Sequence, residues 1–290
     1  MRGLRWKIGG HALALLATIL LGGLLSATLV RLAPGFDTDE RELDPHLSAQ
    51  SVQAIREARQ KDRSILRFYF AYMQNAAHGE LGTSLALGQP VRTLLRDRAP
   101  LTLRLITVGL GLAWLLTLTL ALSAAWLRLS VYDTLTTIVS GTFLCIPAAV
   151  LALLSVLWNA PGSLAIALII FPHTFRYTRN LLVKGYSRPH IVTARAKGIG
   201  AARILFWHVV PVVAPQLLAV AGVSVSMAVG AAIPVEALCG LAGIGQLAWQ
   251  AALARDLPLL VNITVLVTLV TLLANSSADV IGSVVRGQDA

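Results

Sequence analysis

Residues 105–127 read LITVGLGLAWLLTLTLALSAAWL and contain no charged side chain. About 20 consecutive apolar residues are enough for a helix to cross the hydrocarbon core of a bilayer. Only 13% of the whole chain is charged, against about 25% in soluble domains. Further apolar runs occupy residues 11–30, 135–158, 163–175, 212–235 and 259–274. The sequence therefore predicts an all-α polytopic membrane protein.

The distribution of basic residues predicts six transmembrane helices with both termini in the cytoplasm. Pro161 and Gly162 separate the third apolar run from the short fourth run, which favours two spans there. Six spans then place four segments on one side of the membrane: residues 1–10, 128–134, 176–211 and the C-terminal tail. Short loops rich in Lys and Arg stay in the cytoplasm. We interpret the first run as an uncleaved span, because it is longer than the apolar region of a signal peptide.

A large external loop, residues 31–100, is expected between the first and second spans. It carries ten basic and nine acidic residues, so its charges nearly cancel. Leu66, Tyr69, Phe70 and Met73 share one helical face and predict an amphipathic helix that packs against the bundle. The expected organisation is an N-terminus with the first span (1–30), this external loop, and a core of five further spans (101–290).

The net charge of +10 is better explained by membrane orientation than by nucleic-acid binding. Between Asp133 and Glu236 there is no acidic residue, and the basic residues of this interval lie together between Arg176 and Arg203. The two cysteines are far apart and are interpreted as free thiols. Phosphate-binding loops, zinc-protease motifs and nucleophile elbows are absent from the sequence. No catalytic, cofactor-binding or metal-binding residues are therefore predicted.

The cytoplasmic loop at 184–211 has the pattern of two short helices separated by glycine. An Ala-rich stretch favours a helix that ends at Gly198. A second helix is expected after Gly200, with Ile204, Leu205 and Trp207 on its apolar side. Such a projection suits docking into a groove of a soluble partner. A loop lying on anionic lipid headgroups has the same composition, and composition alone does not separate the two.

An external segment with several glycines follows the fifth apolar run. Glu236 precedes Gly243 and Gly245, which allow tight turns beside a short helix. The pattern predicts a re-entrant or interfacial segment, because irregular backbone at membrane depth must be shielded by protein or line a watery cavity. Arg255 and Asp256 are candidates for a local ion pair with a structural role.

Three blocks of the chain together resemble one protein family. The cytoplasmic block comprises Thr193, Ala194, Arg195, Ala196, Lys197, Gly198, His208 and Pro211. The external block comprises Glu236, Gly243, Gly245, Arg255, Asp256 and Pro258. The third block comprises residues 79–84, 88–91 and 100–103. In order and spacing these blocks resemble the dipeptide/oligopeptide/nickel family of ABC importer permeases, over residues 62–285. The sequence departs from the family pattern at Val192, in place of Glu, at Val209 and Val210, in place of Arg-Asn, and at Leu257, in place of Tyr.

The resemblance implies a membrane-spanning permease subunit that forms the translocation pathway for small peptides, nickel, metal chelates or similar solutes. Two separate ABC ATPase subunits would dock on the coupling loop at 184–211 and would hydrolyse the ATP. A second permease subunit, a sister chain giving a heterodimer, would complete the pathway. An extracytoplasmic solute-binding protein would deliver the solute to the outer loops, among them the external gate or structural loop at 236–258. The location implied is a bacterial cytoplasmic (inner) membrane, with membrane lipid around the chain.

Two other functions stay open from the residues themselves. A secondary transporter driven by an ion gradient would contain paired broken helices and internal repeats, and we detect neither in the sequence. A structural membrane anchor would move no solute. Dependence of uptake on an ATPase partner separates the three hypotheses.

Overall fold

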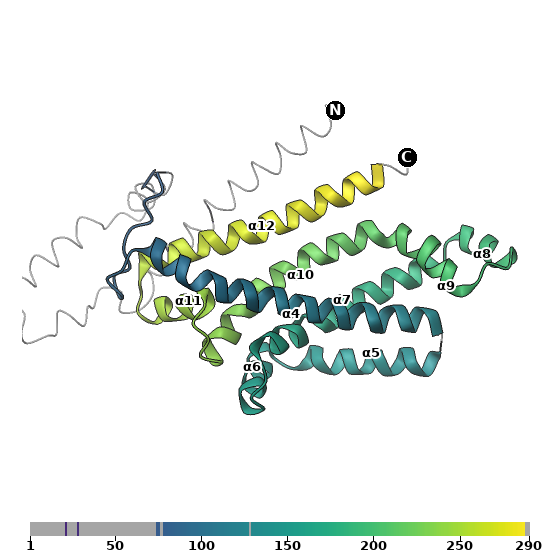
Figure 1. Cartoon of the computed structure of the whole chain (residues 1–290), viewed down its shortest axis with the longest axis horizontal. Helices are drawn as coiled ribbons and strands as arrows, with labels where there is room; N and C mark the ends of the chain where they lie inside the picture. Colours follow the sequence, from purple (N-terminus) through teal and green to yellow (C-terminus); the bar gives the residue numbers. More distant parts are fainter. Residues whose placement is uncertain (1–20, 22–27, 29–73, 76–77, 128, 288–290) are drawn as a thin grey trace, which may run out of the picture. The chain divides into compact units, whose positions relative to one another are not determined.

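The computed structural model describes residues 21, 28, 74–75, 78–127 and 129–287 of the chain. Its helices are α4 (Val91–Leu127), α5 (Ser130–Cys145), α6 (Ala148–Leu157), α7 (Gly162–Tyr186), α8 (Pro189–Ala196), α9 (Ala201–Ile204), a π-helical turn (Leu205–Val209), α10 (Val210–Leu238), α11 (Ile244–Leu253) and α12 (Leu257–Gly287) (Figure 1). Within the described residues, extended pairing is confined to one bridge between Thr83 and Pro90. The all-α class is therefore confirmed for this part. The amphipathic helix at 66–73 and most of the first apolar run lie outside the described residues.

Several of these helices are suited to a membrane. Three are long and apolar enough to cross one: Val91–Leu127, Ala201–Leu238 and Leu257–Ala278. A fourth is added if α5 and α6 together form one span. These helices agree with a polytopic membrane protein. The six-span topology and the placement of both termini in the cytoplasm stay predictions.

The apolar run at 135–158, expected as one span, is broken in the structure. α5 ends at Cys145, α6 begins at Ala148, and the two axes differ by 95°. The break lies at Ile146, which has extended dihedrals (φ −85°, ψ 123°) and precedes Pro147. The proline ring clashes with a helical conformation of the residue before it, and proline has no N–H to continue the hydrogen-bond ladder. The apolar composition of the run concealed this break.

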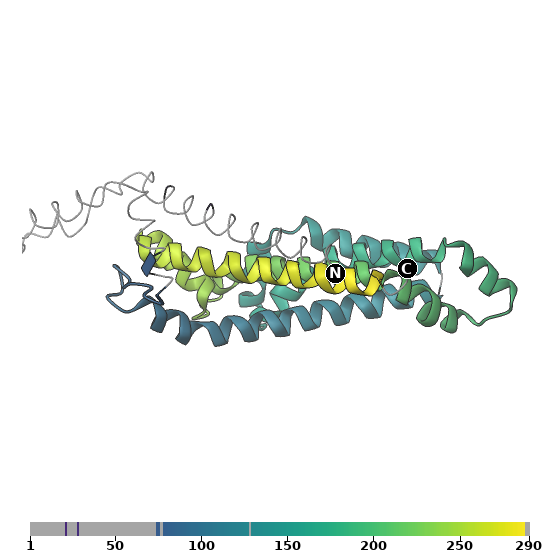
Figure 2. The same ribbon diagram turned by 90° about the horizontal axis from the view of Figure 1, so that it is seen from above.

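Two compact units make up the chain: residues 1–98 with 247–269, and residues 99–246 with 270–290. In the second unit, α7 packs against α5, α6 and α10 (Figures 1 and 2). Hydrogen bonds between side chains join α4 to its neighbours in this unit. Thr117 bonds Thr174 of α7 at 2.6 Å, and the Trp114 indole N–H donates to Ser224 of α10 at 3.0 Å. The expected boundaries at residues 30 and 100 stay predictions.

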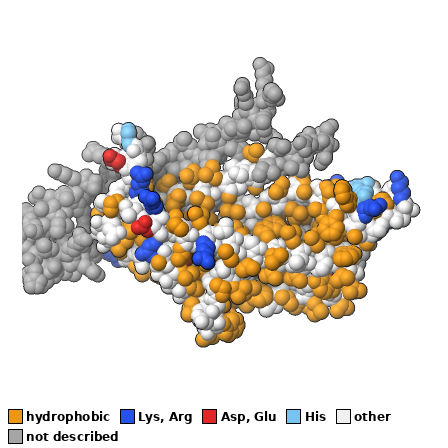
Figure 3. Space-filling model, in the orientation of Figure 1, with side chains coloured by type: hydrophobic (Ala, Val, Ile, Leu, Met, Phe, Trp, Pro, Cys, Tyr) orange, Lys and Arg blue, Asp and Glu red, His pale blue; other side chains and the backbone are white. Residues whose placement is uncertain are grey.

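Glycines allow the helices of this second unit to approach closely. A Cβ atom on Gly109 of α4 would lie 2.7 Å from the Ile166 side chain of α7. A Cβ on Gly185 of α7 would lie 2.8 Å from the Val209 side chain. Small residues at such crossings are typical of membrane helices, whose association depends on close packing rather than on exclusion of water. Hydrophobic side chains cover much of the flank of α4 and α5, and Lys, Arg or His side chains are visible near the start of α4 and at the α8–α9 end (Figure 3).

The contact at Gly109 predicts that Gly109→Ala lowers stability by about 1–3 kcal/mol, because the new methyl group overlaps with Ile166. Gly111→Ala is the matched control on the same helix, since nothing lies within 4 Å of a Cβ there. Alanine favours helix over glycine by about 0.5–1 kcal/mol, so the control should be neutral or more stable. Thermal unfolding of the detergent-purified chain measures both. Equal melting temperatures would contradict the close α4–α7 contact.

Candidate functional site

The predicted coupling segment forms two helices joined by a glycine turn. α8 ends at Ala196, and Gly198 follows with φ +74°. The turn is closed by hydrogen bonds from the Ile199 N–H to the Ala194 carbonyl (3.2 Å) and from the Lys197 N–H to the Thr193 carbonyl (3.1 Å). Glycine adopts this left-handed conformation without the steric cost of a side chain. The prediction that the first helix ends at Gly198 and a second begins after Gly200 is confirmed.

One face of this segment is anchored in the bundle. Ile191 and Ala194 of α8 are buried, together with Ile204, Leu205 and Val209. They form one cluster with Phe171, Phe175 and Leu182 of α7, Ala121 of α4 and Val213 of α10. This cluster anchors α8, which packs against α9, and the π-helical turn after α9 packs in turn against α7 and α10.

The opposite face of the segment is exposed. Among the predicted coupling residues, Ala194 is buried and His208 half-buried, whereas the exposed ones are Thr193, Arg195, Ala196, Lys197, Gly198 and Pro211. Val192 (65% exposed) adds an apolar side chain to the same face of the chain. We name the exposed residues Val192, Arg195, Lys197, Arg203, Phe206 and Trp207 the coupling surface.

Trp207, expected on the apolar side of the second helix with Ile204 and Leu205, does not share their environment. Ile204 and Leu205 are buried, whereas Trp207 is 78% exposed and Phe206 52% exposed. Residues 205–209 form a π-helical turn, in which the spacing of 3.6 residues per turn no longer predicts the buried face. The result is an exposed aromatic pair beside basic residues, a composition found both on protein interaction surfaces and at membrane–water interfaces.

Glu236, Gly243 and Gly245 of the external block are brought together. The Glu236 side chain is fully buried and accepts hydrogen bonds from the backbone N–H groups of Gly245 (2.6 Å) and Gln246 (3.2 Å). The N–H of Ile244 donates to the Thr102 hydroxyl at 2.8 Å. The first N–H groups of a helix have no partner within it. Glu236 and Thr102 thus satisfy the start of α11, where a carboxylate also interacts favourably with the helix dipole.

Both glycines are required by the closeness of this turn. A Cβ on Gly243 would overlap with the Glu236 carboxyl group, and a Cβ on Gly245 would lie 2.6 Å from the Ile233 Cα. The turn before α11 is therefore folded directly over the carboxylate. This close approach is the physical reason for glycine at these two positions.

Asp256 performs a similar task in the other compact unit. One carboxylate oxygen accepts from the Leu259 N–H at 3.1 Å, which caps the start of α12. The other oxygen accepts from the Ser84 hydroxyl and from the Ala86 N–H at 3.1 Å. Asp256 is fully buried. It therefore ties the loop at 84–86 to the α12 N-terminus.

The neighbours of Asp256 complete this junction. Arg255 has φ +54°, and the Asp256 N–H donates to the Ala251 carbonyl (2.9 Å) to close the end of α11. The Asn262 amide donates to the carbonyls of Leu81 (3.0 Å) and Pro258 (2.8 Å). The local ion pair expected between Arg255 and Asp256 stays a prediction, since the carboxylate contacts described here serve the backbone and Ser84.

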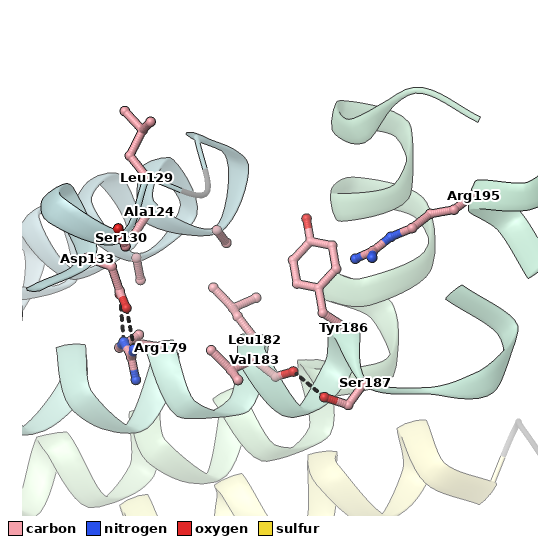
Figure 4. Close-up of a pocket in the computed structure, with 12 residues that line it drawn as sticks. Ala124, Leu129, Ser130, Asp133, Arg179, Leu182, Val183, Tyr186, Ser187 and Arg195 are labelled. Atoms are coloured by element: carbon pink, nitrogen blue, oxygen red, sulfur yellow. Dashed lines mark hydrogen bonds and ion pairs between the residues drawn. The ribbon is translucent and has the colours of Figure 1, made fainter. Parts of the chain in front are cut away.

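Sequence reasoning missed several polar partners. Thr102 and Ser84 lie in the third block of the resemblance, but nothing in the sequence pairs them with α11 or with Asp256. It also missed the ion pair between Asp133 of α5 and Arg179 of α7, in which the Arg179 Nε–H donates to Oδ1 at 2.7 Å and a terminal N–H donates to Oδ2 (Figure 4). Asp133 and Arg179 are far apart in the sequence, and no motif or spacing predicted their contact. Within the described residues, no group of three or more His, Cys, Asp or Glu could hold a metal ion.

The family described as "Binding-protein-dependent transport system inner membrane component" matches residues 117–286. This stretch contains α8, the coupling surface, Glu236 and Asp256. The chain belongs to this family. The resemblance to importer permeases drawn from the three sequence blocks is thereby confirmed, and the family's description is that of a transport component in a membrane.

Similar proteins cover nearly the whole chain. The oligopeptide transport system permease protein OppB of Escherichia coli (strain K12) is 28% identical over 298 residues, covering 95% of this chain and 96% of its own length. OppB of Haemophilus influenzae is 27% identical, covering 93% and 94%. A putative peptide transport system permease protein of Brucella abortus (strain 2308) is 27% identical, covering 83% and 84%. The likeness thus extends beyond residues 117–286.

The overlap between Gly243 and Glu236 predicts a non-additive pair of substitutions. Gly243→Ala alone should lower stability by about 1–3 kcal/mol, because its methyl group displaces the carboxylate. In a Glu236→Ala background the same substitution should cost clearly less, since the group it displaces is gone. Gly230→Ala, with nothing within 4 Å of its Cβ, is the control. Chemical unfolding of the four variants measures the coupling, and strict additivity would contradict the geometry.

The contacts of Asp256 predict that Asp256→Ala releases the loop at 81–90. The substitution removes the cap of α12 and both contacts to residues 84–86. Amide hydrogen exchange of peptides from 81–90 should become faster, with a loss of stability of about 1–3 kcal/mol. Asp97→Ala, at an exposed position of α4, should leave this exchange unchanged. Equal protection in the two variants would show that the loop is held by other contacts.

Proposed function

We propose that this chain is a membrane-spanning permease subunit of an ABC importer in a bacterial inner membrane, and that its solutes are short peptides. Its family is described as binding-protein-dependent and as an inner membrane component. Relatives that cover most of the chain are named peptide or oligopeptide permeases. These names favour peptides over the nickel and metal chelates that the sequence resemblance also allowed.

The observation that carries the proposal is the coupling surface on α8 and the π-helical turn. Its exposed aromatic and basic side chains lie on a segment whose other face is buried in the bundle. Two ABC ATPase subunits would dock here and on the same surface of a second, sister permease. The segment is short and firmly packed, as a lever between two proteins must be.

The packing of α8 gives a route for the motion. A displacement of α8 would act on α9 and on the π-helical turn, which packs against α7 and α10. α7 in turn packs against α5 and α6. The Asp133–Arg179 ion pair joins α7 to α5 near the same end. Alternating access requires two packings of the bundle that ATP binding can exchange. A solute-binding protein would deliver the peptide at the opposite side, to the external loops.

The proposed topology has six spans with both termini in the cytoplasm. Four of these spans are the three long apolar helices and the pair α5 and α6 taken as one span. The proposal adds α7 and the apolar run at 11–30 as the other two. α7 spans 25 residues, or about 37 Å at 1.5 Å per residue. Its charged residues, Arg176, Arg179 and Lys184, lie in its C-terminal half, where long side chains would reach the cytoplasmic interface.

The conformation of Gly198 predicts a specific loss of coupling. Gly198→Val places a β-branched residue at φ +74° and should distort the turn after α8. Gly200→Val is the matched control, because Gly200 has φ −62° and open space around its Cβ. ATPase co-purification and ATP-dependent peptide uptake in proteoliposomes should fall at least tenfold for Gly198→Val only.

The same assay separates the competing functions. Peptide uptake by the chain without any ATPase, driven by an ion gradient, would support a secondary transporter instead. A chain that purifies alone, stable and folded, with no uptake under either condition would contradict the importer proposal.

A further inference from the structure

A hollow of about 450 Å³ lies beside the coupling segment (Figure 4). It is lined by the end of α4, the beginning of α5, the last turns of α7 and one residue of α8, Arg195. All of these residues belong to the same compact unit. The hollow is open to the surface and shares Arg195 with the coupling surface, but neither Phe206 nor Trp207 lines it.

The hollow has an excess of positive charge. Asp133 is the only acidic residue among its lining residues, all of which are described, and both of its carboxylate oxygens accept hydrogen bonds from one edge of the Arg179 guanidinium. Arg195 therefore supplies a second cation without a second carboxylate in the lining. Its guanidinium carbon lies 5.8 Å from the centre of the Tyr186 ring. Figure 4 shows the side chain directed toward Tyr186, back over the hollow rather than away from it.

The rim of the hollow is apolar. Leu129 is 57% exposed and Val183 51% exposed, although both belong to the lining. Exposed aliphatic side chains beside basic groups suit a ligand with a hydrocarbon part and an anionic part. The Ser130 hydroxyl in the same lining provides a further donor, whereas the Ser187 hydroxyl donates to the Val183 carbonyl at 3.2 Å.

We propose that this hollow binds an anionic phospholipid of the inner leaflet, with the headgroup phosphate at Arg195 and an acyl chain along Leu129 and Val183. Basic pockets between helices on the cytoplasmic side of a membrane bind anionic headgroups of this kind. The proposal rests on the topology above, which places 176–211 at the cytoplasmic interface. A bound lipid would join α8 to the ends of α5 and α7 and so stabilise one position of the coupling helix.

The test measures lipid binding to the purified full-length chain in detergent, by native mass spectrometry. Phosphatidylglycerol and phosphatidylcholine with the same acyl chains are compared. Wild type should retain phosphatidylglycerol preferentially.

Arg195→Gln should raise the apparent Kd for phosphatidylglycerol about tenfold, which is the effect of losing one charge-assisted hydrogen bond. Lys197→Gln is the matched control, because Lys197 is an exposed cation of the same segment that does not line the hollow.

A second variant tests the hollow without changing its charge. Ala125→Leu fills part of the lining and should weaken phosphatidylglycerol binding, with thermal unfolding as the check that the chain is folded. Equal retention of the two lipids, or equal losses in Arg195→Gln and Lys197→Gln, would overturn the proposal. Displacement of phosphatidylglycerol by millimolar inorganic phosphate alone would indicate a free-anion site rather than a lipid site, and would also overturn it.

The outcome is independent of the transport assay. No ATPase, binding protein or solute is present, so preferential lipid binding would stand even if ATPase co-purification failed. Conversely, a functional importer whose Arg195→Gln variant binds lipid like wild type would remove only the lipid site.

Discussion

The backbone groups at helix ends impose the constraint on which this structure depends. The first N–H groups of a helix have no partner within it, and hydrocarbon offers none. Buried carboxylates meet this need twice: Glu236 at the start of α11 and Asp256 at the start of α12. Each carboxylate lies at a break between helices, so the broken segment after α10 is held by the hydrogen bonds that these two side chains accept.

Close backbone approach follows from the same contacts. The turn before α11 lies so near to Glu236 that Gly243 and Gly245 leave no room for a Cβ. Helix C-termini are closed differently, by residues with positive φ at Gly198, Gly240 and Arg255. At the first two, glycine has no steric cost, whereas Arg255 adopts φ +54° despite its side chain. The chain keeps this conformation beside Asp256, whose buried contacts fix the position of the next helix.

The proposed function depends on a contrast between the two faces of the coupling segment. Its buried face makes α8 part of the bundle, and its exposed face carries the groups that a soluble partner would bind. Because the ion pair of Asp133 with Arg179 and the hollow beside it lie next to this segment, partner and lipid would act on the same helix ends. In an importer, movement of the ATPase must be passed to the helices of the permease while these helices stay folded. A docking segment with one exposed face and one buried face is suited to this.

The sequence by itself determined the helical class, the membrane environment, the family, the glycine turn at Gly198 and the grouping of Glu236 with Gly243 and Gly245. These features can be predicted from the sequence because they depend on residues that are close together in the chain: the length of an apolar run, the position of a glycine and the order of a motif. The break at Ile146 follows from a local signal in the sequence, Pro147, which the apolar composition outweighed in the prediction. Only the tertiary structure decided the exposure of Trp207, where a π-helical turn changes the helical periodicity. It alone also paired Asp256 with Ser84, Ile244 with Thr102 and Asp133 with Arg179. The two members of each pair are separated by many residues, and a single sequence does not predict which distant polar groups come into contact when the helices pack.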